Sequence, residues 1–207
     1  MILSRAEIPW STARRPYEQH RSLWKLFPDH PAESRQQHEQ ERQGFLFRVE
    51  DIRPGRPARV LLQSATWPTP AAGIALIGSR EVDPKPCAGQ RLAFLLTANP
   101  VKTIKDTQAA DKPGKRRDTC RVPLIDDVEQ AQWLRRKLDG AAVVDAVSVL
   151  PHQPLFFQRG SRGGKLQIVT FEGVLTVVDP SRLCSLLRNG IGPAKAFGCG
   201  LLLVRRA

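Results

Sequence analysis

The chain has 207 residues, of which 41% are hydrophobic and 25% are charged, and its formal net charge is +12. This hydrophobic content supports a packed core and excludes wholesale disorder. The positive excess favours a polyanionic partner, either a nucleic acid or an anionic membrane surface. No apolar run approaches the roughly 18 residues that span a bilayer, and the N-terminus lacks the basic-then-apolar layout of a signal peptide. We therefore expect a soluble, cytoplasmic protein without a membrane partner that is a monomer when free.

The first part of the chain alternates between strand-like and helix-like patterns. Pro16 suits the first turn of a helix, and a proline- and glycine-rich turn separates two apolar runs in the way that is typical of paired strands. We expect strands at residues 1–8, 45–51, 58–65 and 81–83, and helices at residues 17–27 and 69–79. The resulting order is that of a ferredoxin-like unit.

The second part of the chain repeats this order of elements. Val128, Ala131 and Leu134 have helical spacing, Asp179 with Pro180 forms a typical start of a helix, and Gly173 indicates a bend or bulge. We expect strands at residues 90–98, 143–150, once or twice within 166–179 and at 201–204, and helices at residues 128–138 and 180–188. The fold class is therefore α+β, with two tandem ferredoxin-like (RRM-like, βαββαβ) domains at residues 1–86 and 87–207.

Positive charge gathers in two segments of the second domain. Residues 102–121 hold seven lysines and arginines against three aspartates, among them Lys102, Lys105, Arg116 and Arg117. A connection of this length is typical of a functional or mobile segment, so either a loop that becomes ordered on a nucleic acid or an ordinary surface loop is possible. From residue 151 onward there are eight basic residues and two acids, for which a solvated basic face is the simpler explanation.

A glycine-rich turn at residues 157–165, FQRGSRGGK, predicts a basic hairpin tip. It carries Arg159, Arg162 and Lys165, and arginine forms forked hydrogen bonds to phosphates and base edges. Such a tip fits entry into a groove of a nucleic acid, although a solvated turn would have the same pattern.

Residues 190–200, GIGPAKAFGCG, form a second glycine-rich segment. Gly190, Gly192, Gly198 and Gly200 permit positive φ angles and close backbone approach, and Lys195 adds a cation. The order of these residues matches neither a Walker A motif nor a dinucleotide fingerprint. We expect this loop to position a phosphate backbone or to close the interface between the domains.

The candidate catalytic pair is Tyr17 and His20. Residues three apart share one face of a helix, and Arg21 and Lys25 lie close by in the sequence. A histidine exchanges a proton near neutral pH, so the pair could act on a ribose hydroxyl or a leaving oxygen. A structural histidine beside Leu23 is the alternative.

Metal and disulfide chemistry find little support in the sequence. The four cysteines are scattered without a C-x-x-C pair, so we expect free thiols and no zinc site. The acids Asp126, Asp127 and Glu129 suit the N-terminus of the helix at 128–138. We expect no metal and no cofactor, and weaker roles for His30, His38 and His152.

Together these segments resemble the CRISPR-associated endoribonuclease of the type I-E system, the CasE family. The resemblance runs nearly end to end, through HRSLWKLFP, VLLQSATWP, NPVKTIKD, CRVPLI, WLRRKL, FEGVLTV and GIGPAKAFGCGLL at residues 20–28, 60–68, 99–106, 120–125, 133–138, 171–177 and 190–202.

The resemblance implies a reaction and a set of partners. It implies metal-independent cleavage of CRISPR precursor RNA at the 3′ base of the repeat hairpin, by attack of a 2′-OH that leaves a 2′,3′-cyclic phosphate and a 5′-OH. It assigns catalysis to His20 with Tyr17, and groove binding to the hairpin at 157–165. It also implies that the protein keeps the crRNA and joins other subunits of the Cascade complex. A non-catalytic module that binds structured RNA is the alternative, and a metal-dependent nuclease is a third possibility.

Overall fold

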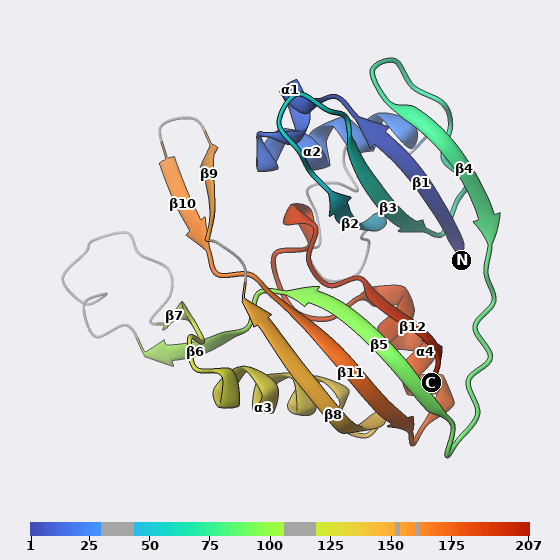
Figure 1. The fold of residues 1–207 in the computed structure, drawn as a ribbon, viewed down its shortest axis with the longest axis vertical. Helices are drawn as coiled ribbons and strands as arrows, with labels where there is room; N and C mark the ends of the chain where they lie inside the picture. Colours follow the sequence, from blue (N-terminus) through green and yellow to red (C-terminus); the bar gives the residue numbers. More distant parts are fainter. Residues whose placement is uncertain (30–43, 106–118, 152–153, 160–161) are drawn as a thin grey trace.

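Two antiparallel four-stranded sheets, one from each half of the chain, make up the fold (Figure 1). The computed structural model describes residues 1–29, 44–105, 119–151, 154–159 and 162–207. No helix in these ranges is long and apolar enough to cross a membrane. His30, His38, Arg116, Arg117 and His152 lie outside the described residues.

The first sheet has the strand order β2-β3-β1-β4 and carries its helices on one face (Figure 1). Strand β1 lies in the interior of the sheet, paired with β3 on one side and β4 on the other, and its alternation buries every second side chain, Ala6 and Ile8 among them. The elements are β1 (Ile2–Ile8), α1 (Trp10–Ala13), α2 (Pro16–Leu23), η1 (Trp24–Leu26), β2 (Phe45–Asp51), β3 (Ala58–Ser64) and β4 (Ala75–Glu81).

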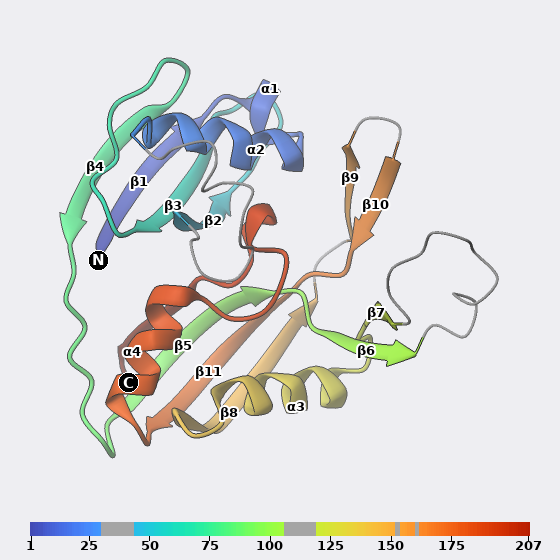
Figure 2. The same cartoon turned by 180° about the vertical axis from the view of Figure 1, so that it is seen from behind.

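The second sheet has the order β12-β5-β11-β8, and α3 and α4 cover one of its faces (Figure 2). Asp126 and Asp179 cap the two helices by accepting hydrogen bonds from backbone N–H groups of the first turn. The elements are β5 (Arg91–Ala98), β6 (Val101–Lys105), β7 (Thr119–Pro123), α3 (Asp127–Leu138), β8 (Ala142–Pro151), β9 (Leu155–Arg159), β10 (Arg162–Leu166), β11 (Val169–Val177), α4 (Pro180–Asn189), η3 (Lys195–Phe197) and β12 (Leu202–Arg206).

The expected α+β class with two tandem ferredoxin-like domains is confirmed. Both sheets place the first and third strands of the unit in the centre. Residues 82–90 connect the sheets, and the proposed boundary between residues 86 and 87 falls inside this connection.

The expected helix at residues 69–79 and the strand at 81–83 are wrong. The chain turns at Gly73, which has φ +81°, and then runs as β4 along the free edge of β1, pairing Ala6 with Leu76 and Ile2 with Glu81. A short apolar run is compatible with helix or strand. Here residues 75–81 pair with the open edge of β1, and in the described part of the first domain no helix stands between β3 and β4, where the unit has its second helix.

Other expected boundaries differ less. The helix expected at 17–27 starts at Pro16, ends at Leu23 and continues as the 3₁₀ turn η1. Residues 169–177 form a single strand, and its irregularity lies between Val174 and Leu175 rather than at Gly173. Gly173 instead allows close approach of the Ala146 carbonyl, which a Cβ at this position would meet.

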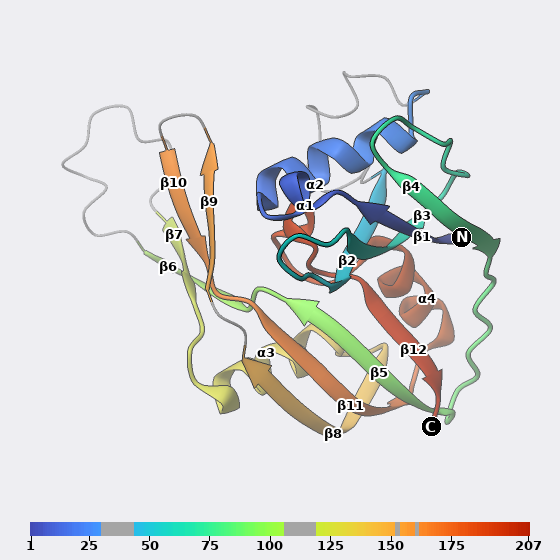
Figure 3. The same ribbon diagram turned by 45° about the horizontal axis from the view of Figure 1, so that its top comes forward.

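Two hairpins extend from the second sheet. The pair β6–β7 lies near the start of α3, whereas β9–β10 rises beside α1 and α2 of the first domain (Figure 3). The glycine-rich turn at 157–165 therefore forms the expected hairpin, and the fold brings it next to the helix that carries Tyr17 and His20.

A buried hydrogen bond fixes the contact between the domains. The Gln63 side chain on β3 donates to the carbonyl of Leu187 at 2.7 Å and to that of Arg188 at 3.3 Å, both at the end of α4. Carbonyls in the last turn of a helix lack partners within the helix. The first sheet supplies that partner, so the two domains hold a defined relative position.

Candidate active site

An aromatic cradle on β2 holds the His20 ring. The ring centroid of His20 lies 5.4 Å from that of Phe45 and 6.2 Å from that of Phe47, and Trp24 meets it edge-on at 5.9 Å. Phe45 and Phe47 share one face of β2 because side chains alternate along a strand. The imidazole is thus oriented by three rings while His20 remains partly exposed.

Burial against these rings changes the protonation of His20. It lowers the pKa of the imidazole from 6.5 to about 4, because loss of solvent disfavours the charged form. The neutral imidazole is therefore the form present at neutral pH, and it can accept a proton.

Helix α2 begins where α1 ends, and Gln19 ties the two helices together. Its buried side chain donates a hydrogen bond of 2.6 Å to the Ala13 carbonyl. This contact sets the direction of α2. Tyr17 lies in the first turn with 38% of its surface exposed, three residues before His20, so the two side chains lie on one side of the helix.

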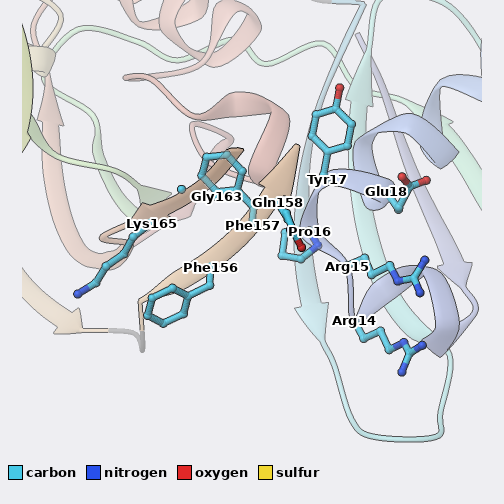
Figure 4. Close-up of a pocket in the computed structure, with 11 residues that line it drawn as sticks. Arg14, Arg15, Pro16, Tyr17, Glu18, Phe156, Phe157, Gln158, Gly163 and Lys165 are labelled. Carbon is cyan, nitrogen blue, oxygen red and sulfur yellow. The ribbon is translucent and has the colours of Figure 1, made fainter. Parts of the chain in front are cut away.

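Tyr17 forms part of the wall of a cavity of about 1060 Å³ between the two domains (Figure 4). The first domain contributes the end of α1 and the start of α2, and the hairpin contributes the opposite wall. The lining residues are Arg14, Arg15, Pro16, Tyr17, Glu18, Phe156, Phe157, Gln158, Gly163, Gly164 and Lys165. His20 is not among them and lies one turn further along α2.

The hairpin is anchored to the glycine-rich loop by two phenylalanines. The ring of Phe157 on β9 lies 4.6 Å from that of Phe197 in η3. Gly164, opposite Phe157 in the ladder, leaves room for the Phe157 ring. The hairpin therefore keeps a defined position beside α2.

The glycine-rich loop packs against the cradle of His20 rather than lining the cavity. A Cβ on Gly198 would lie 3.3 Å from the Phe47 ring, and one on Gly192 would lie 2.8 Å from the Trp133 ring. Gly200 donates a backbone hydrogen bond to Thr97 and accepts one from Ile191. The expectation that this loop closes the domain interface agrees with these contacts, and its role in binding a phosphate backbone stays a prediction.

Gly190 should tolerate substitution poorly, because both its backbone conformation and its packing require glycine. Its φ of +72° and ψ of 166° form a conformation that is essentially restricted to glycine, and a Cβ would lie 2.8 Å from the Gly200 oxygen. We expect Gly190→Ala to lower the free energy of unfolding by roughly 1–3 kcal/mol or more. Urea denaturation measures this change. Gly55→Ala is the control, because Gly55 also has a positive φ but open space around it, and an equal loss in both variants would contradict the packing argument.

The predicted basic residues take different positions. Arg21 is exposed and lies 3.8 Å from Glu18, and Lys25 is exposed in η1. Lys102 forms an ion pair of 3.1 Å with Glu129. Lys105 is exposed at the end of β6, which Figure 3 places away from α2.

Lys195 has a structural partner within its own loop. Its ammonium group donates to the Asn189 carbonyl at 2.7 Å, and burial lowers its pKa. This bond satisfies a carbonyl at the end of α4. Contact of Lys195 with RNA stays a prediction, as does contact by Arg159 and Arg162, which form the last pair of the hairpin ladder.

Several site residues were missed in the sequence analysis. The cradle residues Phe45 and Phe47 were assigned only to a strand, and Arg14 and Arg15 were not considered. The consecutive pair Phe156 and Phe157 could have been selected from the sequence. Adjacent side chains of a strand point to opposite sides, so one of the two rings must face away from the other.

The acids near α3 serve the helix, as expected. The carboxylate of Asp126 accepts hydrogen bonds from the N–H groups of Val128 and Glu129 at 2.9 and 3.0 Å. Within the ranges that the structure describes, no three histidine, cysteine or acidic side chains gather in a way that could hold a metal ion.

The fold and the site define a class: tandem ferredoxin-like proteins with a histidine on the first long helix and a basic hairpin facing it. The chain belongs to the family of CRISPR-associated proteins, whose family model matches residues 1–206.

Two relatives are similar over nearly the whole chain. The Escherichia coli K12 protein described as "CRISPR system Cascade subunit CasE" is 42% identical over 203 residues, which is 98% of each chain. The Thermus thermophilus "CRISPR-associated endoribonuclease Cse3" is 38% identical over 91% of this chain and 89% of its own.

Solved structures agree with these relatives. Cas6e from E. coli K-12 matches with a TM-score of 0.84 at 40% identity and full coverage of both chains. T. thermophilus Cse3, bound to an RNA representing a pre-cleavage complex, matches with a TM-score of 0.74 at 33% identity over 99% of this chain and 98% of that one.

Proposed function

We propose that this chain is a metal-independent endoribonuclease of the cytoplasm that cleaves CRISPR precursor RNA at the 3′ base of the repeat hairpin. It then holds the crRNA as a subunit of a Cascade complex. The observation that carries the proposal is a neutral, oriented histidine on the helix that borders a basic cavity. The names of the relatives, an endoribonuclease and a Cascade subunit, support it.

The chemistry follows from the protonation of His20. Its neutral imidazole accepts the proton of a ribose 2′-OH while the 2′ oxygen attacks the adjacent phosphorus. A new P–O2′ bond forms, the P–O5′ bond breaks, and a protonated donor such as water supplies the proton to the leaving 5′ oxygen. Tyr17 orients the reacting ribose and phosphate. The products are a 2′,3′-cyclic phosphate and a 5′-OH.

Cations near this helix hold the RNA in the proposed complex. Arg21 and Lys25 follow His20 along the chain, and Lys165 projects from the hairpin wall of the cavity. Stem recognition depends mainly on shape and phosphate contacts, because the major groove of an A-form helix is narrow. Arg159 and Arg162, which form the last pair of the β9–β10 ladder, contribute further phosphate contacts in the proposed complex.

The pH dependence of the reaction should report the neutral form of His20. Its pKa of about 4 lies below the ordinary value, so the proton acceptor is lost only as pH falls through about 4. The value of kcat/KM, which reports the free enzyme, should rise from pH 3 to 5 and then stay level to pH 7. A fall in kcat/KM as pH rises through about 4 would instead show that the imidazolium form is required.

The direct test of the proposed reaction is cleavage in a chelator. The protein is incubated in EDTA with an RNA containing the repeat hairpin, and the products are separated on a gel. We expect cleavage at the 3′ base of the hairpin, and none when the nucleotide before the scissile phosphate carries a 2′-deoxyribose. Tight binding without cleavage of the unmodified RNA would instead indicate a non-catalytic RNA-binding module, and cleavage only after addition of Mg²⁺ would indicate a metal-dependent nuclease.

A further inference from the structure

Phe156 is an exposed aromatic ring on the hairpin wall of the cavity. Its surface is 68% exposed, more than that of any other large hydrophobic residue in the described ranges. The next residue, Phe157, turns to the opposite side of β9 and packs on Phe197. The anchoring of the hairpin therefore uses Phe157 and leaves Phe156 available.

The surroundings of Phe156 are open and basic. Lys165 stands directly opposite in the ladder, with its Nζ 5.8 Å from the centroid of the Phe156 ring. Two residues along, Gln158 pairs with Gly163, which has no side chain to fill the space. Phe156 and Lys165 project together from the hairpin (Figure 4).

The lining of the cavity carries three cations and one acid. The positive charges of Arg14, Arg15 and Lys165 exceed the single negative charge of Glu18. The cavity therefore favours an anionic ligand. An exposed aromatic ring beside a cation, here Phe156 beside Lys165, suits a nucleotide, because the base stacks on the ring while the phosphate meets the cation. A purely apolar ligand would leave the cations without a partner.

We propose that Phe156 is a stacking platform for one unpaired or strand-end base of the bound RNA, and that Lys165 holds a phosphate next to that base. This inference rests on the RNA-binding part of the proposed function. Stacking tolerates any base, since every base presents a π-face. Phe156 thus contributes affinity and register along the strand, so that the scissile phosphate reaches the side of α2 that carries Tyr17 and His20.

The test is a binding experiment that does not depend on cleavage. The probe is the repeat-hairpin RNA of the organism's own CRISPR array with a 2′-deoxyribose before the scissile phosphate. Dissociation constants are measured for the wild type, Phe156→Leu and Phe156→Trp, and for a series of probes that each lack one base. Trp67→Leu is the matched control, because Trp67 is 58% exposed and lies outside the cavity.

We expect Phe156→Leu to weaken binding by roughly tenfold, since stacking of one base contributes about 1–3 kcal/mol. Phe156→Trp and Trp67→Leu should bind as the wild type does. Removal of one particular base should raise the dissociation constant of the wild type. The same removal should leave the dissociation constant of Phe156→Leu unchanged.

Three results would overturn the inference. The first is equal affinity of Phe156→Leu and the wild type, which would leave Phe156 as a contact for another protein subunit. The second is that every base removal weakens binding by Phe156→Leu as much as it weakens binding by the wild type. The third is that the protein does not bind the hairpin probe at all. A failure of the proposed cleavage is seen in a separate experiment. In that case the wild-type protein binds all-ribose RNA and the RNA stays intact.

Discussion

Replacement of His20 by alanine should lower the single-turnover rate of RNA cleavage by roughly 10²–10⁴-fold, the usual contribution of a positioned proton acceptor. The dissociation constant for RNA should change little, because His20 lies outside the lining of the basic cavity. Quench kinetics at saturating protein measure the rate, and filter binding of a 2′-deoxy substrate measures affinity.

A packing control is needed because His20 contacts Phe45, Phe47 and Trp24. His20→Gln keeps a polar side chain of similar length but cannot exchange a proton near neutral pH. We expect it to be as inactive as His20→Ala, with a Tm close to that of the wild type. Cleavage within tenfold of the wild-type rate by either variant would remove His20 from the chemistry.

Neutralisation of the hairpin should have the largest effect on affinity. In the triple variant Arg159→Gln, Arg162→Gln and Lys165→Gln, each lost phosphate contact reduces the release of counterions. The slope of log Kobs against log salt should become shallower by about 2 to 3. Titrations with the hairpin RNA at several salt concentrations measure this slope.

The matched control removes the same charge from the opposite edge of the molecule. Arg80→Gln, Lys85→Gln and Arg206→Gln alter exposed residues on β4, on the connection between the sheets and at the end of β12, which Figure 1 places away from the hairpin. This variant should keep nearly the wild-type slope. Equal changes in both variants would mean that net charge, and not the hairpin, determines binding.

Local signals were sufficient to predict most helices and strands. Asp179 followed by Pro180 predicted the start of α4, and the structure confirms the cap. The helix at 128–138 could likewise be predicted from its apolar spacing. The strand β4 could not be predicted from local signals, because its conformation depends on the edge of β1, about 70 residues earlier in the chain.

The candidate site also contains residues that the sequence could predict and residues that it could not. Tyr17 and His20 could be selected from helical spacing and from the resemblance to a family, and the hairpin from its glycines. The cradle of His20 could not, because Phe45 and Phe47 come from β2 and reach α2 only through packing in the first core. The lowered pKa of His20 follows from that burial and has no signature in the sequence.

The glycine-rich loop shows how a motif can be found before its purpose is known. Its four glycines all have positive φ, as their spacing suggested. Their neighbours, however, are Leu46 and Phe47 of the first domain as well as Trp133 of the second. The loop thus supports the cradle of the catalytic candidate, a role that requires both sheets to be in place.

The chemical nature of the cleaved ends tests the central claim most directly. RNA with the repeat hairpin is cleaved by the wild-type protein in EDTA, and both fragments are analysed by mass spectrometry. The proposed reaction predicts a 2′,3′-cyclic phosphate on the upstream fragment and a 5′-OH on the downstream fragment. A 3′-OH and a 5′-phosphate would contradict it, because those ends require attack by water rather than by the ribose 2′-OH.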